Sequence, residues 1–214
     1  MRTGMALASV PSLPMAAIAR HRLVLLSGLG CWLLAATSGM AVLWAYGATP
    51  GTPAEPPRTW PTTSALVREP GRPTLLVFAH PHCPCTRATV EELDRLLASV
   101  DEMPQVQVLF AKPDGTEPAW EHTDLWSRAE SIPGVSVARD DGGAEADRFG
   151  AATSGQVLLY DVAGNLRFAG GITPSRGHAG DSAGRSTLQE LLASRHPPQD
   201  ETPVFGCALH EAPP

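Results

Sequence analysis

The chain has 214 residues, 43% of them hydrophobic and 18% charged, which is enough for one well-packed domain with additional segments. Its formal net charge of -6 and its single lysine, Lys112, argue against a nucleic-acid-binding surface, which needs clustered basic residues. The four cysteines, Cys31, Cys83, Cys85 and Cys207, are too few for a disulfide scaffold and fit redox chemistry better.

Residues 1–22 form a short tail, and the run 23–46 that follows has no charged residue. About 24 helical residues cover roughly 36 Å, which is enough to cross a bilayer. Arg20 and Arg22 place the N-terminus in the cytoplasm by the positive-inside rule. A cleavable signal peptide is the alternative, although its apolar core is normally about 7 to 15 residues long. We therefore expect a single-pass signal anchor in the cell membrane, with the rest of the chain on the periplasmic or extracytoplasmic side.

The segment 47–71 is rich in proline, which prevents helix formation and disfavours sheet. We interpret it as a semi-extended linker that holds a folded domain away from the membrane. The domain is expected over 72–198, and residues 199–214 are expected to form a C-terminal tail.

From residue 72 onwards, strand-like and helix-like patterns alternate. Expected strands cover 74–79, 106–110, 134–138, 157–160 and 166–168, and expected helices follow Cys85 and cover 118–131, 144–149 and 187–194. Thr187 and Glu190 have capping-box spacing, which marks the start of the last helix. The residues between the last two strands favour a hairpin. This order predicts an α/β fold with a mixed sheet that is covered by helices on both faces.

A cysteine motif stands where the first apolar strand ends and an amphipathic helix begins. Cys83 at the first turn would lie among unpaired backbone N–H groups and the positive end of the helix dipole. Such a setting lowers the pKa of a cysteine from about 8.5 to roughly 3.5–7.5, so Cys83 is the candidate nucleophile. Thr86 lies on the same helical face, and its hydroxyl is expected either to hydrogen-bond the Cys83 thiolate or to cap the helix.

Two thiols compete for the role of the resolving cysteine. Cys85 is the favoured candidate, although residues two apart on a helix do not face each other, so that a Cys83–Cys85 bridge needs the first turn to open. Such a bridge would be strained and easily reduced. Cys207 resolves Cys83 instead if the C-terminal tail folds back onto the domain.

The motif resembles a known family on residues that span both elements. Leu76-Val77-Phe78, Cys83-Pro84-Cys85-Thr86-Arg87-Ala88 and Glu92-Leu93 resemble the active-site segment of thioredoxin-like proteins, above all the membrane-tethered redoxin type. The Cys-Pro-Cys-Thr motif also resembles a small bacterial group sometimes labelled RedB. The resemblance implies a thioredoxin-like fold, no cofactor, protein disulfide or thiol substrates, and a membrane-embedded or exported electron donor.

The resemblance also assigns roles to individual positions. It places Cys83 on the attacking cysteine of the family, Thr86 on the second cysteine of Cys-X-X-Cys, and His82 on the residue before the attacking cysteine. A protonated imidazole at His82 would lower the pKa of the neighbouring thiol. The family places a proline opposite the active site, whereas this chain reads Thr153-Ser154-Gly155-Gln156 there.

The function that follows is a membrane-anchored thiol-disulfide oxidoreductase. One alternative is a thiol peroxidase of the peroxiredoxin type, in which Cys83 passes through sulfenic acid. The other is a copper-binding assembly factor of thioredoxin fold, because two imidazoles and two thiols within six residues are donors that suit copper or zinc. Its ligands would be His80, His82, Cys83 and Cys85.

Overall fold

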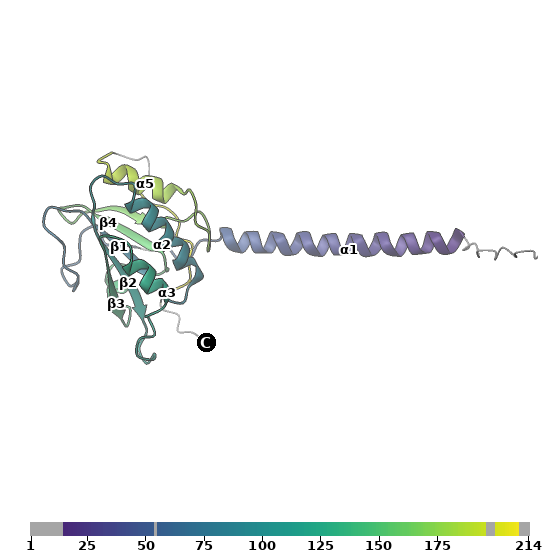
Figure 1. Ribbon diagram of the computed structural model, residues 1–214, viewed down its shortest axis with the longest axis horizontal. Coiled ribbons are helices and arrows are strands. Elements are labelled where there is room, and N and C mark those ends of the chain that lie inside the picture. The colour runs from purple at the N-terminus through teal and green to yellow at the C-terminus, as the bar shows by residue number, and fades with distance from the viewer. Residues whose placement is uncertain (1–14, 54, 196–199, 210–214) are drawn as a thin grey trace, which may run out of the picture. The chain divides into compact units, whose positions relative to one another are not determined.

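The computed structural model describes residues 15–53, 55–195 and 200–209 (Figure 1). It divides into two units that meet after Ala45, and each unit is described by itself. Helix α1 (Met15–Ala48) accounts for the described part of the first unit. The stretch Ala19–Ala48 is long and apolar enough to cross a membrane. The span expected over 23–46 lies inside this helix.

The second unit is built on a five-stranded mixed sheet with the strand order β3-β2-β1-β4-β5. Strands β1, β2 and β3 are parallel, and β4 is antiparallel to both β1 and β5. The strands are β1 (Thr74–Ala79), β2 (Gln105–Lys112), β3 (Val135–Asp141), β4 (Gln156–Tyr160) and β5 (Leu166–Gly170). The helices are α2 (Pro84–Leu97), α3 (Asp124–Glu130), α4 (Ala144–Arg148) and α5 (Ala183–Leu192). The α/β mixed sheet expected from the sequence is confirmed.

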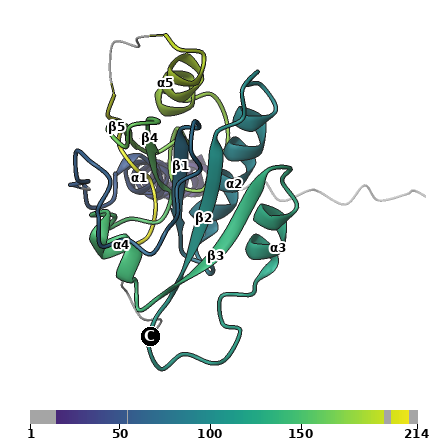
Figure 2. The ribbon, with the colours of Figure 1, turned by 90° about the vertical axis from the view of Figure 1, so that its left-hand side faces the viewer.

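Each face of the sheet has its own hydrophobic core, because successive side chains of a strand point to opposite faces. Leu75 and Val77 of β1 pack with residues of α2, α3 and α5, whereas Leu76 and Phe78 pack with residues of α4. Figure 2 shows α4 on one side of the sheet and α2 and α3 on the other. The sheet is therefore covered on both faces.

The proline-rich segment, which we expected to be a semi-extended linker, packs in its described part against the α4 side of the sheet. Trp60 lies edge-to-face against Phe149 and Tyr160, with ring centroids 4.9 and 5.3 Å away. The Tyr160 hydroxyl donates a hydrogen bond of 2.9 Å to the Pro57 carbonyl. Proline excludes regular structure but does not stop neighbouring apolar side chains from packing. This segment thus contributes to the core of the domain.

Two helices begin at other residues than expected. Helix α3 is shorter than the expected 118–131 because its N-cap is Thr123, whose hydroxyl accepts a hydrogen bond from the first turn. Helix α5 starts earlier than the expected 187–194, and its N-cap is Ser182. The prediction that Thr187 caps this helix was wrong, since the helix already begins at Ala183 and Ser182, five residues upstream of Thr187, accepts a hydrogen bond from the Arg185 N–H of the first turn.

Candidate active site

Three cysteines meet beyond the carboxyl end of β1. Cys83 is the N-cap residue of α2, Cys85 lies in the first turn of that helix, and Cys207 approaches from the C-terminal tail. The three sulfur atoms lie within 4.8 Å of one another. The sulfur atoms of Cys83 and Cys207 are 2.7 Å apart, although the residues are 124 positions apart in the sequence. A disulfide has a sulfur separation of about 2.05 Å, so a small movement is enough to close this bond.

Backbone hydrogen bonds hold the tail against the loop that precedes β4. The N–H of Ser154 donates to the carbonyl of Cys207 at 2.8 Å, and the N–H of Leu209 donates to the carbonyl of Ala152 at 3.0 Å. The approach is so close that a Cβ atom on Gly206 would come within 1.8 Å of the Ser154 carbonyl oxygen. A glycine at position 206 is therefore required for Cys207 to reach the site.

The cluster favours negative charge on Cys83. The pKa of Cys83 is lowered to about 4, mainly by the hydrogen bond from the Cys85 thiol. Burial acts in the opposite direction, and hydrogen bonds with Cys207 lower the pKa further. The hydrogen bond between Cys83 and Cys85 raises the pKa of Cys85 far above its ordinary value. Burial, together with the hydrogen bond to Cys83, raises the pKa of Cys207 to about 12. The reduced site therefore holds one thiolate and two thiols at neutral pH.

Thr86 contacts the backbone that presents the thiolate rather than the thiolate itself. Its hydroxyl donates to the His80 carbonyl at 2.9 Å and lies 2.8 Å from the Ser154 hydroxyl. The Ser154 hydroxyl in turn accepts a hydrogen bond of 2.8 Å from the His80 N–H. Among the described residues, these are the hydrogen bonds of the Thr86 side chain. The hydroxyl thus neither bonds the thiolate nor caps the helix, the two roles expected for it. It positions the backbone that leads to Cys83 instead.

The two histidines make other contacts than those expected. Burial lowers the pKa of His80, which is therefore neutral at pH 7, and its Nδ1 accepts a hydrogen bond of 3.2 Å from the His82 N–H. The His82 ring packs on Trp120 at 4.5 Å, and its Nε2 lies 3.0 Å from the Trp120 carbonyl. The interactions that lower the pKa of Cys83 come from the other two cysteines instead of His82.

The loop between β5 and α5 closes the other side of the cluster. The backbone N–H of Gly177 donates to the sulfur of Cys85. The Arg176 guanidinium donates to the Gly206 carbonyl, and its Nε donates to the Thr49 carbonyl at 2.9 Å. The positive charge of Arg176 also favours the thiolate form of Cys207. The sequence placed Ser154 opposite the active site only through the family resemblance, and it favoured a solvated loop around Arg176, because the contacts of both residues are with distant parts of the chain and leave no local pattern.

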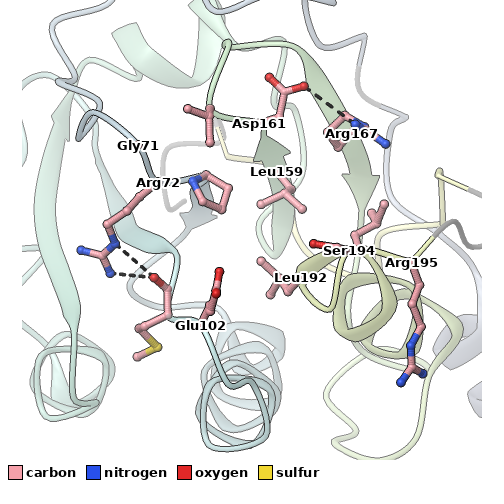
Figure 3. Close-up of a pocket in the computed structure, with 13 residues that line it drawn as sticks. Gly71, Arg72, Glu102, Leu159, Asp161, Arg167, Leu192, Ser194 and Arg195 are labelled. Carbon is pink, nitrogen blue, oxygen red and sulfur yellow. Dashed lines mark hydrogen bonds and ion pairs between the residues drawn. The ribbon is translucent and has the colours of Figure 1, made fainter.

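A pocket of about 630 Å³ lies near the amino end of β1, away from the cysteines (Figure 3). Two of its arginines contact other residues that line the pocket. The Arg72 guanidinium donates to the Met103 carbonyl at 2.8 Å, and Arg167 lies 3.8 Å from the Asp161 carboxylate. The candidate site is therefore the cysteine cluster, where the thiols of the motif lie together.

The mixed sheet with the cysteine motif between β1 and α2 is a thioredoxin-like fold. Among solved structures, the chain is similar to an uncharacterized conserved protein from Geobacillus kaustophilus, with 18% identity and a TM-score of 0.56 over 78% of this chain and 94% of that one. A hypothetical protein from Sinorhizobium meliloti is also similar, with 18% identity and a TM-score of 0.50 over 77% of this chain and 95% of that one. These identities show the fold alone.

A more distant similarity is to a secreted Mycobacterium tuberculosis disulfide oxidoreductase, with 15% identity and a TM-score of 0.42 over 58% of this chain and 83% of that one. No protein-family model and no curated protein matches the sequence. The argument for function therefore rests on the geometry of the cysteines.

Proposed function

We propose that this protein is a membrane-anchored thiol-disulfide oxidoreductase whose working pair is Cys83 and Cys207. The observation that supports the proposal is the 2.7 Å approach of the two sulfur atoms, one of which carries a strongly stabilised thiolate. A thiolate beside a second thiol is the arrangement that disulfide exchange needs. When the Cys83–Cys207 bond forms, two electrons pass to a substrate disulfide, which becomes two thiols. When the Cys83–Cys207 bond opens, two electrons pass to the protein from a substrate dithiol.

Cys85 has a positioning role in this proposal instead of the resolving role that the sequence favoured. Its thiol donates to the Cys83 sulfur and stabilises the thiolate. A thiolate of lower pKa is the better leaving group, so this hydrogen bond favours opening of the Cys83–Cys207 bond. Cys85 therefore tunes the reactivity of the pair without being oxidised in each turnover.

The proposed location is the exported side of the membrane, with α1 as an uncleaved anchor. Arg20 and Arg22 precede the apolar run, and the positive-inside rule then leaves the cysteine cluster on the far side. An active-site disulfide also persists more readily outside the reducing cytoplasm. A reporter enzyme fused after residue 209 should be active only on the exported side and should stay in the membrane fraction. Recovery of a soluble mature protein would contradict the anchor and indicate a cleaved signal peptide.

The experiment that tests the function maps disulfides and measures exchange in the same protein. The control is Cys31→Ser, because Cys31 lies in α1 outside the site. The oxidised protein should yield a linked Cys83–Cys207 peptide, and Cys83→Ser and Cys207→Ser should each lose catalysed exchange with a peptide disulfide. A Cys83–Cys85 link would contradict the working pair. Absence of exchange between the reduced protein and the peptide disulfide would contradict the oxidoreductase.

A soft-metal site is a second candidate, since three sulfurs within 4.8 Å are donors that suit Cu(I) or Zn²⁺. Two thiolates that share one tetrahedral metal at about 2.3 Å lie about 3.8 Å apart. The 2.7 Å between Cys83 and Cys207 is shorter and favours a bond between the sulfurs. Metal analysis of the reduced protein tests this candidate, and tight one-to-one binding that is lost in Cys85→Ser and Cys207→Ser alike would support it.

A further inference from the structure

The three sulfur-bearing residues differ in how easily a partner reaches them. Cys83 is 2% exposed and Cys85 is 7% exposed, whereas Cys207 is only partly buried. We propose, building on the function above, that Cys207 is the sulfur at which a partner protein's thiol enters the site, while Cys83 is the inner sulfur that leaves. The partner chemistry is a dithiol on a peptide or protein, and the product is its disulfide.

The cover over Cys83 is part of the fold. The tail that carries Cys207 is held to Ser154 and Ala152 by the two backbone hydrogen bonds described above, and Leu209 beyond it is 2% exposed in the core. On the other side of the cluster, the Gly177 N–H donates to the Cys85 sulfur. An approach to Cys83 requires the tail to leave the loop that precedes β4, whereas an approach to Cys207 does not require these backbone hydrogen bonds to break.

The exchange step balances without another reagent. The partner thiolate attacks the Cys207 sulfur of the Cys83–Cys207 disulfide, a partner–Cys207 mixed disulfide forms, and the electron pair of the broken bond stays on Cys83 as a thiolate. The second partner thiol, once deprotonated, attacks the partner's own sulfur in the mixed disulfide. The partner leaves as a disulfide, and Cys207 leaves as a thiolate that takes up the released proton. Two electrons have passed from the partner to the protein.

The chemistry of the leaving groups favours the same sulfur. Attack on Cys207 expels the Cys83 thiolate, which the Cys85 thiol still stabilises, and a leaving thiol of lower pKa departs faster. Attack on Cys83 would expel Cys207, whose pKa is raised by burial. Arg176 lies beside Cys207, with its guanidinium on the Gly206 carbonyl, so its positive charge attracts an incoming thiolate. Accessibility, leaving group and local charge therefore all select Cys207.

The test locates the first mixed disulfide. Oxidised Cys31→Ser protein is mixed with a peptide that contains a single cysteine, the reaction is stopped early with acid, and the adduct is mapped by mass spectrometry. The peptide should be found on Cys207 in at least about tenfold excess over Cys83, because the two leaving thiols differ so much in pKa. The double variant Cys31→Ser/Cys85→Ser should give the same site, which excludes a secondary transfer through Cys85.

The outcomes separate this inference from the function on which it rests. A peptide adduct on Cys83 in both proteins would overturn the entry role of Cys207 and leave the oxidoreductase standing. An oxidised protein without a Cys83–Cys207 disulfide would overturn the proposed function itself. A peptide adduct on Cys207, with Cys83 free for alkylation after unfolding, supports both.

Discussion

Ser154 touches both halves of the active site. Its backbone N–H donates to the Cys207 carbonyl at 2.8 Å, and its hydroxyl lies 2.8 Å from the hydroxyl of Thr86 in the cysteine motif. Ser154 therefore fixes the tail and the start of α2 against one another. The position of the Cys207 thiol is therefore set by Ser154, a residue that has no thiol of its own.

The first prediction concerns the buried hydroxyl of Thr86. Thr86→Val keeps the shape but removes one hydrogen bond from the His80 carbonyl and one from the buried Ser154 hydroxyl, so it should lower the free energy of unfolding by about 1–3 kcal/mol. Chemical denaturation of the reduced protein measures the loss. Thr62→Val, at an exposed position, is the control and should change stability by less than about 0.5 kcal/mol. Equal effects of the two substitutions would contradict the positioning role of Thr86.

The second prediction concerns the donor that stabilises the Cys83 thiolate. Cys85→Ala removes the largest cause of the lowered pKa, so the pKa of Cys83 should rise from about 4. The rise should be about 1 to 2 pKa units if the bond is worth as much as other hydrogen bonds to charged groups. Thiolate absorbance in the ultraviolet, followed against pH, gives the value, and Cys83→Ser identifies the signal. An unchanged titration in Cys85→Ala would show that other groups hold the thiolate.

How much of this site was predictable depends on the sequence distance of the contacts. Cys83 could be placed at the start of α2, because a short apolar strand and an amphipathic helix are local patterns that flank it. The nearness of Cys207 could not be derived, because it depends on backbone bonds between the tail and the loop before β4. The packing of Trp60 was missed for another reason, since the surrounding prolines indicate only the absence of regular structure.

The third prediction is that oxidation stabilises the fold. A Cys83–Cys207 disulfide would close a loop between residues 124 positions apart. A disulfide across a loop of this length raises the free energy of unfolding by at most about 5 kcal/mol, because it restricts the unfolded chain. Near pH 4, where the Cys83 thiolate contributes little to the stability of the reduced form, the oxidised protein should therefore unfold at a higher temperature than the reduced protein. Cys85→Ser should keep the difference and Cys207→Ser should abolish it. Scanning calorimetry of both redox states measures the effect, and equal midpoints would argue against this pair.

The fourth prediction follows from the charge on Cys83 in the reduced protein. The folded pKa of Cys83, about 4, is lower than that of the unfolded chain, so the folded protein binds fewer protons between these values. This contribution to stability is fully present above the unfolded pKa and is lost as the pH falls towards 4. The oxidised form has no Cys83 proton and lacks this dependence. The stability advantage of the oxidised protein should therefore shrink as the pH rises from 4 towards neutrality, which denaturation at several pH values measures.

The fifth prediction tests the domain boundary. A soluble protein that begins at Arg72, where the domain was expected to start, lacks Trp60 and the Pro57 carbonyl that pack on Tyr160. It should be less stable than one that begins at Thr49, by about 3 kcal/mol or more, since loss of one large aromatic side chain from a core costs this much. Urea denaturation of the two proteins gives the comparison. Equal stability would restore the interpretation of residues 47–71 as a free linker.

The distance between the paired cysteines along the chain also sets the order in which they become available during synthesis. Cys207 is made 124 residues after Cys83, which corresponds to roughly 6 to 25 s at ordinary rates of translation. During this interval the nascent chain presents Cys83 and Cys85 without their later partner. A Cys83–Cys207 disulfide would therefore be among the last features of the molecule to form, after its own tail has docked.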